Sequence, residues 1–565
     1  MNYLFVRILE IISIRDSAGP RAANKMAHET LALACHEGLS GSGQAYGNLF
    51  SQVDFLCRKH NVKLSDRIAI QAMRRHSNSS DVVERGDFMY DMKALARFVS
   101  AVTGCGVPHE LLRLLPMDDR TGMRAEGLDV RYVRCIVAAW DDDYVYVTAE
   151  QGLSVPLLAV DVQAEHLVHV RKMLREGLQM NLLDCKMSRM EPAGGMSVEG
   201  VGAVVVPGIV VVEPDYLLDI SSLAACFKDY GHHPLTYFLS QMRRRDVSQP
   251  ILLGNLASAV LDGIINQGDA FDLAAAVRSN FAVHALEYCS CDGFDAAGFM
   301  QAAREQAANI RQAVSVMFAD HDRRLAVLEP SFVCEALGLQ GRVDLMTTDM
   351  RLLVEQKSGK NYNIASGRPG AHGSRQLEPH YVQLLLYAGV LRYNFRLGFD
   401  RTDMRLLYSK YKPEDGLLAV AFYRQLFREA VELRNKIVAT DFMIAREGFG
   451  KVLPLLTPDT VNTTKRHDTY YERWLLPELE AVTNPLKSLQ PLEREYFCAM
   501  MTFAARERII GKTGSREGIS SCAADLWNMP LAEKIETGNI YTGLRITTRR
   551  PADGGDAAGV LTLSV

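Results

Sequence analysis

Two carboxylates and an ammonium group stand close together in the segment GRVDLMTTDMRLLVEQKSGK, which begins at Gly341. Asp344 is followed by Glu355 and, two positions later, by Lys357. Carboxylate oxygens are the ligands that Mg²⁺ and Mn²⁺ prefer, and a neighbouring ammonium can orient the attacking water or help to deprotonate it. These residue types predict a divalent-metal centre that hydrolyses phosphodiesters. A surface hairpin with alternating charges would give the same short pattern, so the flanking elements must decide.

Two strands of a hairpin are predicted to position these groups. Residues 341–346 and 352–358 are apolar-rich runs bounded by glycines and by a Thr-Thr-Asp turn. Side chains alternate across a strand, so Glu355 and Lys357 share one face and Gln356 points to the other. The aspartate of the first strand can then meet the shared face across the ladder.

A helix is predicted over residues 379–392, PHYVQLLLYAGVLR, from its apolar spacing. Gln383 and Tyr387 stand four residues apart and therefore lie on one face of this helix. Such a pair can donate hydrogen bonds to a phosphate or brace the metal carboxylates. The helix therefore supplies a second set of candidate residues for the same site.

Together with Gly341 and Gly359, these residues resemble the RecB-type nuclease domain of the PD-(D/E)XK superfamily. The order of motifs over about residues 250–440 is similar to the nuclease part of the replication ATP-dependent helicase/nuclease family. The segments that carry the resemblance are Glu335–Asp344, Glu355–Lys360, Gln383–Tyr387, Leu406–Lys410 and Leu433–Asn435.

The resemblance implies an α/β fold, with a mixed sheet flanked by helices and the metal held at the sheet edge. It implies Mg²⁺ or Mn²⁺ as cofactor and Asp344, Glu355 and Lys357 as catalytic residues. The metal ligands it implies are Asp344, Glu355 and the carbonyl of Gln356, and the substrate-binding residues are Gln383, Tyr387 and Lys360. Glu335 is expected to support the site from behind.

The upstream metal ligand of the family departs from the usual pattern. Relatives carry a Gly-x-x-x-His sequence that opens a helix, whereas the segment beginning at Gly254 has Ser258 in the histidine position. His284 is the obvious substitute, although a lone histidine on an apolar helix is more often structural and imidazole is a softer ligand than Mg²⁺ prefers. A water molecule in place of the histidine remains the alternative.

Two further features of the relatives are not expected in this chain. Many relatives hold a four-cysteine iron–sulfur cluster with three cysteines after the core, but only Cys498 and Cys522 follow here and they are far apart. No iron–sulfur cluster is therefore predicted. The Gly511-Lys512-Thr513 sequence has Arg506 where a Walker loop needs its first glycine, so we expect the helicase motor elsewhere, in a longer chain or on a partner.

Composition is that of an ordinary globular protein of several domains, with 48% hydrophobic and 23% charged residues among 565. Eleven cysteines without framework spacing favour a reducing cytoplasm. The opening MNYLFVRILEII is read as a strand rather than a signal peptide, and no membrane segment is expected. The net charge is −4, yet residues 341–412 hold twelve Lys or Arg against six Asp or Glu, which favours phosphate binding around the site.

Four regions are predicted along the chain: 1–120 mainly helical, 121–215 β-rich, 216–440 nuclease and 441–565 helical with a final β element. The β-rich region reads as a small barrel or meander with a turn at Asp141–Asp143. Its aromatic residues could stack bases as single-strand binders do, although strand aromatics are more often core residues. These residues are Tyr132, Trp140, Tyr144 and Tyr146.

The sequence thus predicts a metal-dependent nuclease for single-stranded or flap DNA, with a helicase motor in cis or in trans as its partner. A catalytically weak nuclease fold that binds DNA or acts as a scaffold for a helicase is the alternative, because Ser258 replaces the expected ligand.

Overall fold

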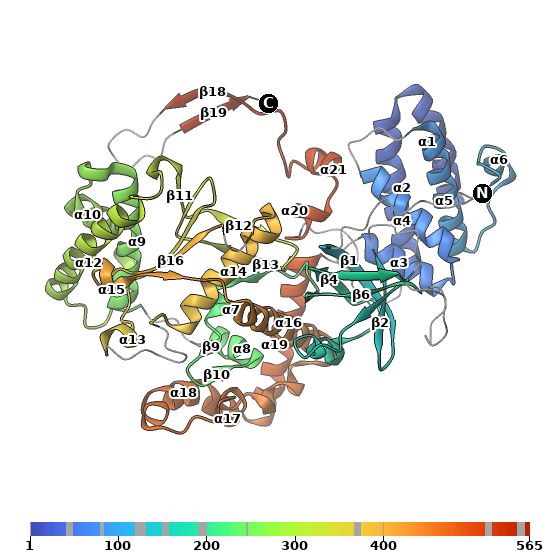
Figure 1. Cartoon of the computed structure of the whole chain (residues 1–565). Helices are drawn as coiled ribbons and strands as arrows, with labels where there is room; N and C mark the ends of the chain where they lie inside the picture. Colours follow the sequence, from blue (N-terminus) through green and yellow to red (C-terminus); the bar gives the residue numbers. More distant parts are fainter. Residues whose placement is uncertain are drawn as a thin grey trace. The chain divides into compact units, whose positions relative to one another are not determined.

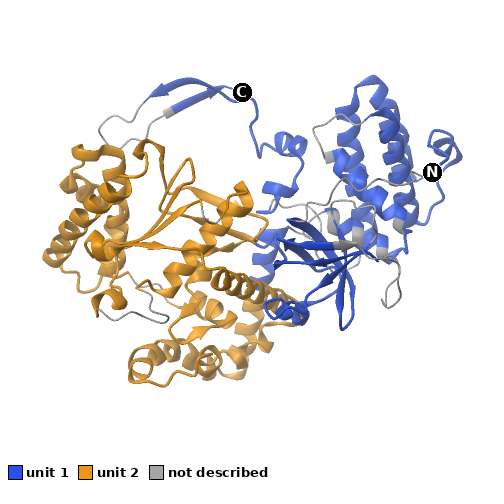
Figure 2. Cartoon of the chain, in the orientation of Figure 1, with its two compact units in different colours: residues 1–216, 503–565 blue, residues 217–502 orange. Residues whose placement is uncertain are grey.

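A computed structural model describes residues 2–40, 49–78, 84–118, 131–149, 157–189, 201–243, 247–366, 375–398, 401–514, 522–550 and 560–564. The chain is mixed α and β and divides into two compact units (Figure 2). The first unit holds residues 1–216 and 503–565, and the second holds residues 217–502. The helix α19 (Pro491–Thr513) runs across the second junction. Within these ranges, no helix is both long enough and apolar enough to cross a membrane.

The first unit begins with a bundle of helices around one apolar core (Figure 1). Its opening segment is helix α1, not the strand that the sequence suggested. Asn2 caps the helix by accepting a hydrogen bond from the N–H of Leu4, and Leu4, Ile8 and Ile11 recur at helical spacing and are fully buried. The bundle consists of α1 (Tyr3–Ser17), α2 (Pro20–Leu39), α3 (Leu49–Lys59), α4 (Leu64–Asn78), α5 (Arg85–Thr103) and α6 (His109–Leu112).

The strands of the same unit form a closed barrel, where the sequence pattern leaves a barrel or a meander open. The pairs Met180↔Val212 and Lys186↔Val206 share one continuous antiparallel register, so β4 with β5 and β6 with β7 are two bent halves of one long hairpin. Because β1 pairs with β4 and β3 pairs with β6, the sheet closes on itself. The strands are β1 (Tyr132–Trp140), β2 (Tyr144–Ala149), β3 (Leu157–Asp161), β4 (Gln179–Leu183), β5 (Lys186–Arg189), β6 (Val201–Val206) and β7 (Ile209–Val212), with a 3₁₀ turn η1 (Val168–Met173).

The aromatic residues of the barrel have different surroundings. Tyr146 is buried, and its hydroxyl donates to Asp141 in the predicted turn, so it is a core residue and cannot stack bases. The other oxygen of Asp141 accepts from the N–H groups of Asp143 and Tyr144, which identifies the acidic turn as structural. Trp140 is 46% exposed.

The C-terminal part of the first unit consists of short helices and a hairpin. They are α20 (Asp525–Asn528), α21 (Leu531–Glu536), β18 (Arg545–Arg550) and β19 (Val560–Ser564). Asp215, buried and paired with Arg134 of the barrel at 2.6 Å, also accepts from Trp527 and Asn528. This carboxylate joins α20 to the barrel.

The second unit is built on a mixed sheet in the order β11-β14-β15-β16-β17 (Figure 1). Helices α9 and α12 pack on one face through Leu345, Val354 and Leu407, and α14 lies on the other. The elements are α9 (Gln249–Gln267), α12 (Ala296–Met317), β11 (Ala326–Leu328), β14 (Leu345–Thr347), β15 (Leu352–Lys357), α14 (Glu378–Phe395), β16 (Asp403–Tyr408) and β17 (Leu417–Val420).

The first strand of the predicted hairpin is split. Residues 341–346 divide between β13 (Leu339–Arg342) and β14, and only β14 pairs with β15. Strand β13 belongs to a second sheet with β12 (Ser331–Cys334) and β8 (Leu218–Asp219). The break falls at Asp344. The N–H of Gln356 donates to the side-chain carboxylate of Asp344, where a regular ladder would have a backbone carbonyl as acceptor.

The remaining elements of the second unit surround these sheets. They are α7 (Ile220–Ala224), β9 (Phe227–Lys228), β10 (Gly231–His232), α8 (Pro234–Met242), η2 (Gly268–Ala270), α10 (Leu273–Val283), α11 (Ala285–Ser290), η3 (Arg323–Leu325), α13 (Tyr362–Ala365), α15 (Pro413–Gly416), α16 (Arg424–Glu447), η5 (Phe449–Lys451), η6 (Leu453–Leu455), α17 (Pro458–Val461), the π-helical turn η7 (Tyr471–Leu475) and α18 (Leu476–Lys487).

Candidate active site

Three predicted residues form one hydrogen-bonded group at the end of β15. The ammonium of Lys357 donates to Oε1 of Glu355 at 2.8 Å and to Oε1 of Gln383 at 3.0 Å. The amide Nε2 of Gln383 donates to the same carboxylate oxygen of Glu355 at 2.6 Å. Strand alternation and the α14 face therefore bring these side chains together as the sequence predicts.

The two carboxylate oxygens of Glu355 have different surroundings: Oε1 accepts two hydrogen bonds, and Oε2 accepts none from the described residues. The side chain is 2% exposed, and none of the described residues donates a hydrogen bond to its Oε2. A buried carboxylate oxygen without a donor is costly unless a cation or a proton meets it. This oxygen is the natural point for a metal ligand bond.

Asp344 and the backbone of Gln356 lie at the same strand edge. The Asp344 carboxylate accepts from the N–H of Gln356 at 2.6 Å. In a strand, the N–H and C=O of one residue point to the same side, so the Gln356 carbonyl faces the Asp344 side. The last pair of the β14–β15 ladder is Leu345↔Val354, two residues short of Gln356, so this carbonyl stands beyond the ladder. Two carboxylates and a carbonyl are the oxygen donors that a hard divalent cation takes.

Burial controls the protonation of both carboxylates. It raises the pKa of Glu355 to about 8, with the charge of Asp344 adding to the effect and Lys357 opposing it. The pKa of Asp344 is also raised by burial, against the hydrogen bond from Gln356 and the charge of Lys357. Two buried like charges without a cation favour binding of a proton. A divalent cation would compete with that proton.

Helices α9 and α12 hold the end of β15 from the opposite face. The side-chain amide of Gln356 donates to the carbonyl of Ala257 on α9, and Gln306 on α12 donates to the carbonyl of Ser358. Gly254 lets α9 approach, because a Cβ there would lie 3.2 Å from the Ser358 hydroxyl. Helix α9 begins at Gln249, earlier than the predicted opening at Gly254.

Tyr387 is buried behind the group rather than exposed to it. Its hydroxyl donates to the carbonyl of Arg342 at 2.6 Å, and Gly341 leaves room, since a Cβ there would lie 2.9 Å from that hydroxyl. Gln383 also donates to Ser221 on α7, a residue that the sequence analysis did not single out. In this structure Tyr387 therefore braces the end of β13, two residues before Asp344.

Two acidic residues near Asp344 were missed by the sequence analysis. Glu329 stands opposite Asp344, its N–H donating to the Asp344 carbonyl at 3.0 Å, and its side chain pairs with Arg342. Asp262 lies on α9, and burial raises its pKa to about 6, with Glu329 and Asp344 adding to the effect. Its spacing was a usable signal, because Asp262 follows Ser258 by one turn and Gly254 by two.

His380 is a third missed residue. It stands one turn before Gln383 on α14, and its Nδ1 lies 3.1 Å from the Tyr408 hydroxyl. Burial and the charge of Lys357 lower its pKa to about 3, so the imidazole is neutral beside the site. The helical spacing from Gln383 to His380 could have identified it.

His284 and Glu335 lie away from this group. His284 lies between α10 and α11, with its Nδ1 3.4 Å from Glu287. Glu335 lies in the turn before β13, at the other end of that strand from Asp344. Among the described residues, no three or more His, Cys, Asp or Glu side chains are arranged to hold a metal ion, so His284 does not complete a ligand set with Asp344 and Glu355.

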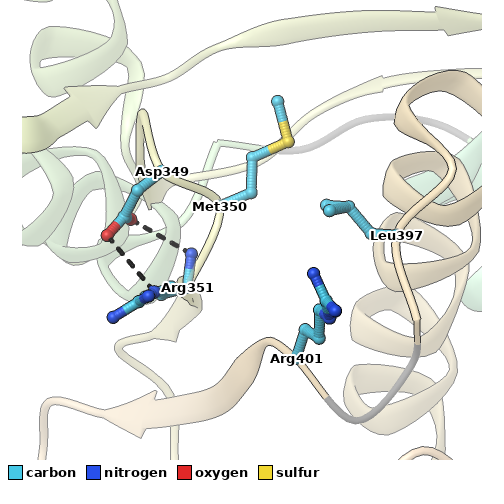
Figure 3. Close-up of a pocket in the computed structure, with 5 residues that line it drawn as sticks. All are labelled: Asp349, Met350, Arg351, Leu397 and Arg401. Carbon is cyan, nitrogen blue, oxygen red and sulfur yellow. Dashed lines mark hydrogen bonds and ion pairs between the residues drawn. The ribbon is translucent and has the colours of Figure 1, made fainter.

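A pocket of about 620 Å³ lies at the opposite end of β15. Figure 3 shows Met350 facing Leu397 and Arg401, with Asp349 bonded to Arg351 at the β14–β15 turn. None of the predicted site residues is among the described residues that line it, which are Asp349, Met350, Arg351, Leu397 and Arg401.

No protein-family model matches the chain, and no curated protein matches it. The chemistry of the site is therefore inferred from its own residues and their contacts.

Proposed function

We propose that this chain is a divalent-metal-dependent nuclease for single-stranded or flap DNA, the nuclease part of a helicase–nuclease of DNA replication and repair. The observation that carries the proposal is the buried Glu355 carboxylate, held on one oxygen by Lys357 and Gln383 while the other oxygen has no donor among the described residues. A buried ion pair arranged only for stability would leave no acceptor unsatisfied.

Asp344, Glu355 and the Gln356 carbonyl would hold Mg²⁺ or Mn²⁺, which when bound polarises the phosphoryl oxygen as a Lewis acid. Lys357 has its ammonium fixed by two acceptors and is 24% exposed, so its remaining N–H is directed to orient the attacking water. The water oxygen bonds to phosphorus as one ester P–O bond breaks; the water gives up a proton to solvent, and the leaving sugar oxygen takes one from solvent. Gln383 keeps Lys357 and Glu355 in register through both ends of its amide.

The test is cleavage of labelled single-stranded, flap and duplex DNA with Mg²⁺, Mn²⁺ or EDTA. We expect cleavage that either metal supports, that EDTA abolishes, and that Asp344→Ala and Glu355→Ala remove. Asp349→Ala is the matched control, because this carboxylate of the same unit lies at the far end of β15. Full activity in Asp344→Ala would overturn the assignment.

A catalytically weak nuclease fold that binds DNA for a helicase partner is the second candidate. The observation that favours it is that three metal-ligating side chains do not group together among the described residues, with Ser258 in place of the histidine of the relatives. Under this alternative, the wild type and Asp344→Ala bind DNA equally and neither cleaves it with any metal.

A further inference from the structure

His380 on α14 lies against the end of the strand that carries Lys357. The parallel ladder of β15 and β16 pairs Lys357 with Tyr408, so the two side chains stand next to each other on one face of the sheet. On that face, the Tyr408 hydroxyl lies 3.1 Å from Nδ1 of His380. Gln383, one turn after His380 on α14, accepts a hydrogen bond from Lys357. Contacts through Tyr408 and through Gln383 therefore place the imidazole beside Lys357.

The hydrogen bonds of Tyr408 decide which nitrogen of His380 carries the proton. The Tyr408 side chain is fully buried, and its oxygen accepts from the N–H of Leu377 at 3.1 Å. A buried hydroxyl proton needs an acceptor, and Nδ1 of His380 is the acceptor that the described residues offer. Because Nδ1 accepts, the neutral ring carries its proton on Nε2. Burial and the charge of Lys357 lower the pKa of His380 to about 3, which keeps the ring neutral.

The Nε2–H group of His380 is open to a ligand. The side chain is half-buried, and its Nε2 is neither buried nor hydrogen-bonded to any of the described residues. The Lys357 ammonium has three N–H groups and gives two of them to Glu355 and Gln383, so one remains. Two neighbouring donors, one charged and one neutral, suit a negatively charged group that only accepts hydrogen bonds. The oxygens of a phosphodiester are such acceptors, whereas a base carries donors as well.

The segment after β15 adds a second cation near the start of α14. Asn361 is fully buried, and its side-chain amide donates to the carbonyl of Arg375, three residues before α14 begins. This bond holds the segment beside the start of the helix. Lys360, which the sequence predicts to bind substrate, is exposed on the segment, with its ammonium 5.2 Å from the centre of the Tyr362 ring. An anionic chain that passes His380 would therefore meet a cation beyond it as well.

We infer that the Nε2–H of His380 donates a hydrogen bond to a non-bridging oxygen of one phosphodiester of the bound DNA strand, beside the group on which Lys357 acts. A neutral donor can hold this oxygen next to the ammonium without repelling it. Tyr408 has the role of a positioning residue, because its hydroxyl sets the tautomer and the orientation of the ring. This inference rests on the proposed function and deepens it by naming a further residue that contacts the substrate.

The test compares two variants of the full chain. His380→Leu removes the donor, whereas His380→Gln keeps one, because an amide has an acceptor and a donor as the neutral imidazole does. Binding of a labelled single strand is measured in EDTA, where no cleavage occurs. Single-turnover cleavage with Mg²⁺ is measured on strands of the same sequence that each carry one methylphosphonate isomer, in which a methyl group replaces one non-bridging oxygen. The length of the product reports which bond is cut.

His321→Leu is the matched control. His321 is a half-buried histidine of the same unit, and its Nε2 contacts Asp403 at the opposite end of β16 from Tyr408. This variant should bind and cleave as the wild type does. Melting temperatures of all three variants show whether each one is folded.

We expect His380→Leu to lower the affinity for the ordinary strand and its cleavage rate by about tenfold or more, the scale for losing a hydrogen bond to a charged group. His380→Gln should recover most of both losses. At one phosphate position, one methylphosphonate isomer should slow the wild type and make it equal to His380→Leu, because the accepting oxygen is gone. At the other positions, the difference between the two proteins should persist.

The inference is wrong if His380→Leu binds and cleaves as the wild type does, if His380→Gln is as impaired as His380→Leu, or if the loss is the same with every methylphosphonate. No binding of the strand by the wild type would also overturn it. Failure of the proposed function has a different signature: no metal supports cleavage, yet His380→Leu binds the strand more weakly than the wild type and His380→Gln. Conversely, normal cleavage by both the wild type and His380→Leu removes only the phosphate contact.

Discussion

At the scale of single residues, a substitution of Lys357 distinguishes an effect on the cleavage rate from an effect on DNA affinity. Its ammonium contacts Glu355 and Gln383 and is mostly buried, so under the proposed function it acts on the attacking water and contributes little to attracting a distant strand. We expect Lys357→Ala to slow cleavage by ~10²-fold or more, the scale for losing a positioned catalytic group, with little change in DNA affinity. Single-turnover rates and binding in EDTA measure the two effects.

Lys451→Ala, a change of an exposed lysine in the same unit, is the control for lost positive charge. An equal loss of affinity in Lys357→Ala, Gln383→Ala and Tyr387→Phe would favour the scaffold alternative.

Glu355 gives a prediction about pH and stability. Its pKa is raised to about 8, above its value in an unfolded chain, so the folded protein holds a proton on this group at pH values where the unfolded chain has lost it. The wild type therefore loses stability as pH rises from about 4.5 to about 8, by at most about 1.4 kcal/mol per pH unit. We expect Glu355→Gln to raise the melting temperature of metal-free protein at about pH 8 and to change it little at about pH 5.

The same protonation of Glu355 is expected to control how strongly the site binds Mg²⁺. Because a cation must displace the proton, Mg²⁺ should raise the melting temperature of the wild type more at about pH 8 than at about pH 6, and should not do so in Glu355→Gln. A pH-independent response to Mg²⁺ would contradict the assignment of Glu355 as a ligand.

At the scale of elements, α9 decides the question of the upstream ligand. Gly254 packs on Ser358 and Asp262 acts on Asp344, so Ser258, one turn from each, lies on the side of α9 that faces the site. We expect Ser258→His to lower the Mg²⁺ concentration needed for half-maximal cleavage, because an added ligand binds the metal more tightly. His284→Ala should leave that concentration unchanged, since His284 contacts Glu287.

Ser258→Ala is the matched control for loss of the hydroxyl. If His284→Ala needed more Mg²⁺ for half-maximal cleavage, His284 would be the upstream metal ligand, and the assignment of that ligand position to Ser258 on α9 would be wrong.

The packing of α14 against β13 gives a second prediction at this scale. A methyl group at residue 341 would lie 2.9 Å from the Tyr387 hydroxyl and 3.2 Å from Ile220, so Gly341→Ala should destabilise the protein by about 1–3 kcal/mol and slow cleavage. Adding Tyr387→Phe removes the clashing oxygen and should recover part of the loss, which a double-mutant cycle of melting experiments measures.

Gly359→Ala is the control, because a Cβ at that glycine meets no atom within 4 Å. Equal destabilisation by the two alanine substitutions would show that the Tyr387 contact is unimportant.

At the scale of the whole molecule, charge distribution matters more than net charge. The chain carries −4 overall, whereas residues 341–412 hold twice as many basic as acidic residues. We expect binding of single-stranded DNA to weaken steeply with salt, with a slope of about −0.7 in log affinity against log salt for each phosphate contact. Titrations from low to moderate NaCl in EDTA measure the slope, and affinity independent of salt would contradict phosphate binding by this region.

Sequence periodicity determined the local elements of the second unit. Alternation placed Glu355 and Lys357 on one face, and helical spacing placed Gln383 and Tyr387 on another element's face, because both depend only on backbone geometry. The same reasoning failed at the N-terminus, where MNYLFVRILEII fits both periods and burial against α2 and α5 selected the helix. It also joined β13 and β14 into one strand, because the break depends on a hydrogen bond to Gln356, twelve residues away in sequence.

Tertiary structure alone decided which groups meet. That Gln383 bonds Glu355, that Tyr387 is buried against Arg342, and that Asp262 rather than His284 acts on Asp344 all depend on how α9 and α14 pack on the two faces of one sheet. A sequence gives the spacing of residues along a helix or strand, but it does not say which face of the neighbouring sheet that element packs against. Packing fixes that choice, and with it the desolvation that raises the pKa of Glu355 and leaves its Oε2 without a donor among the described residues.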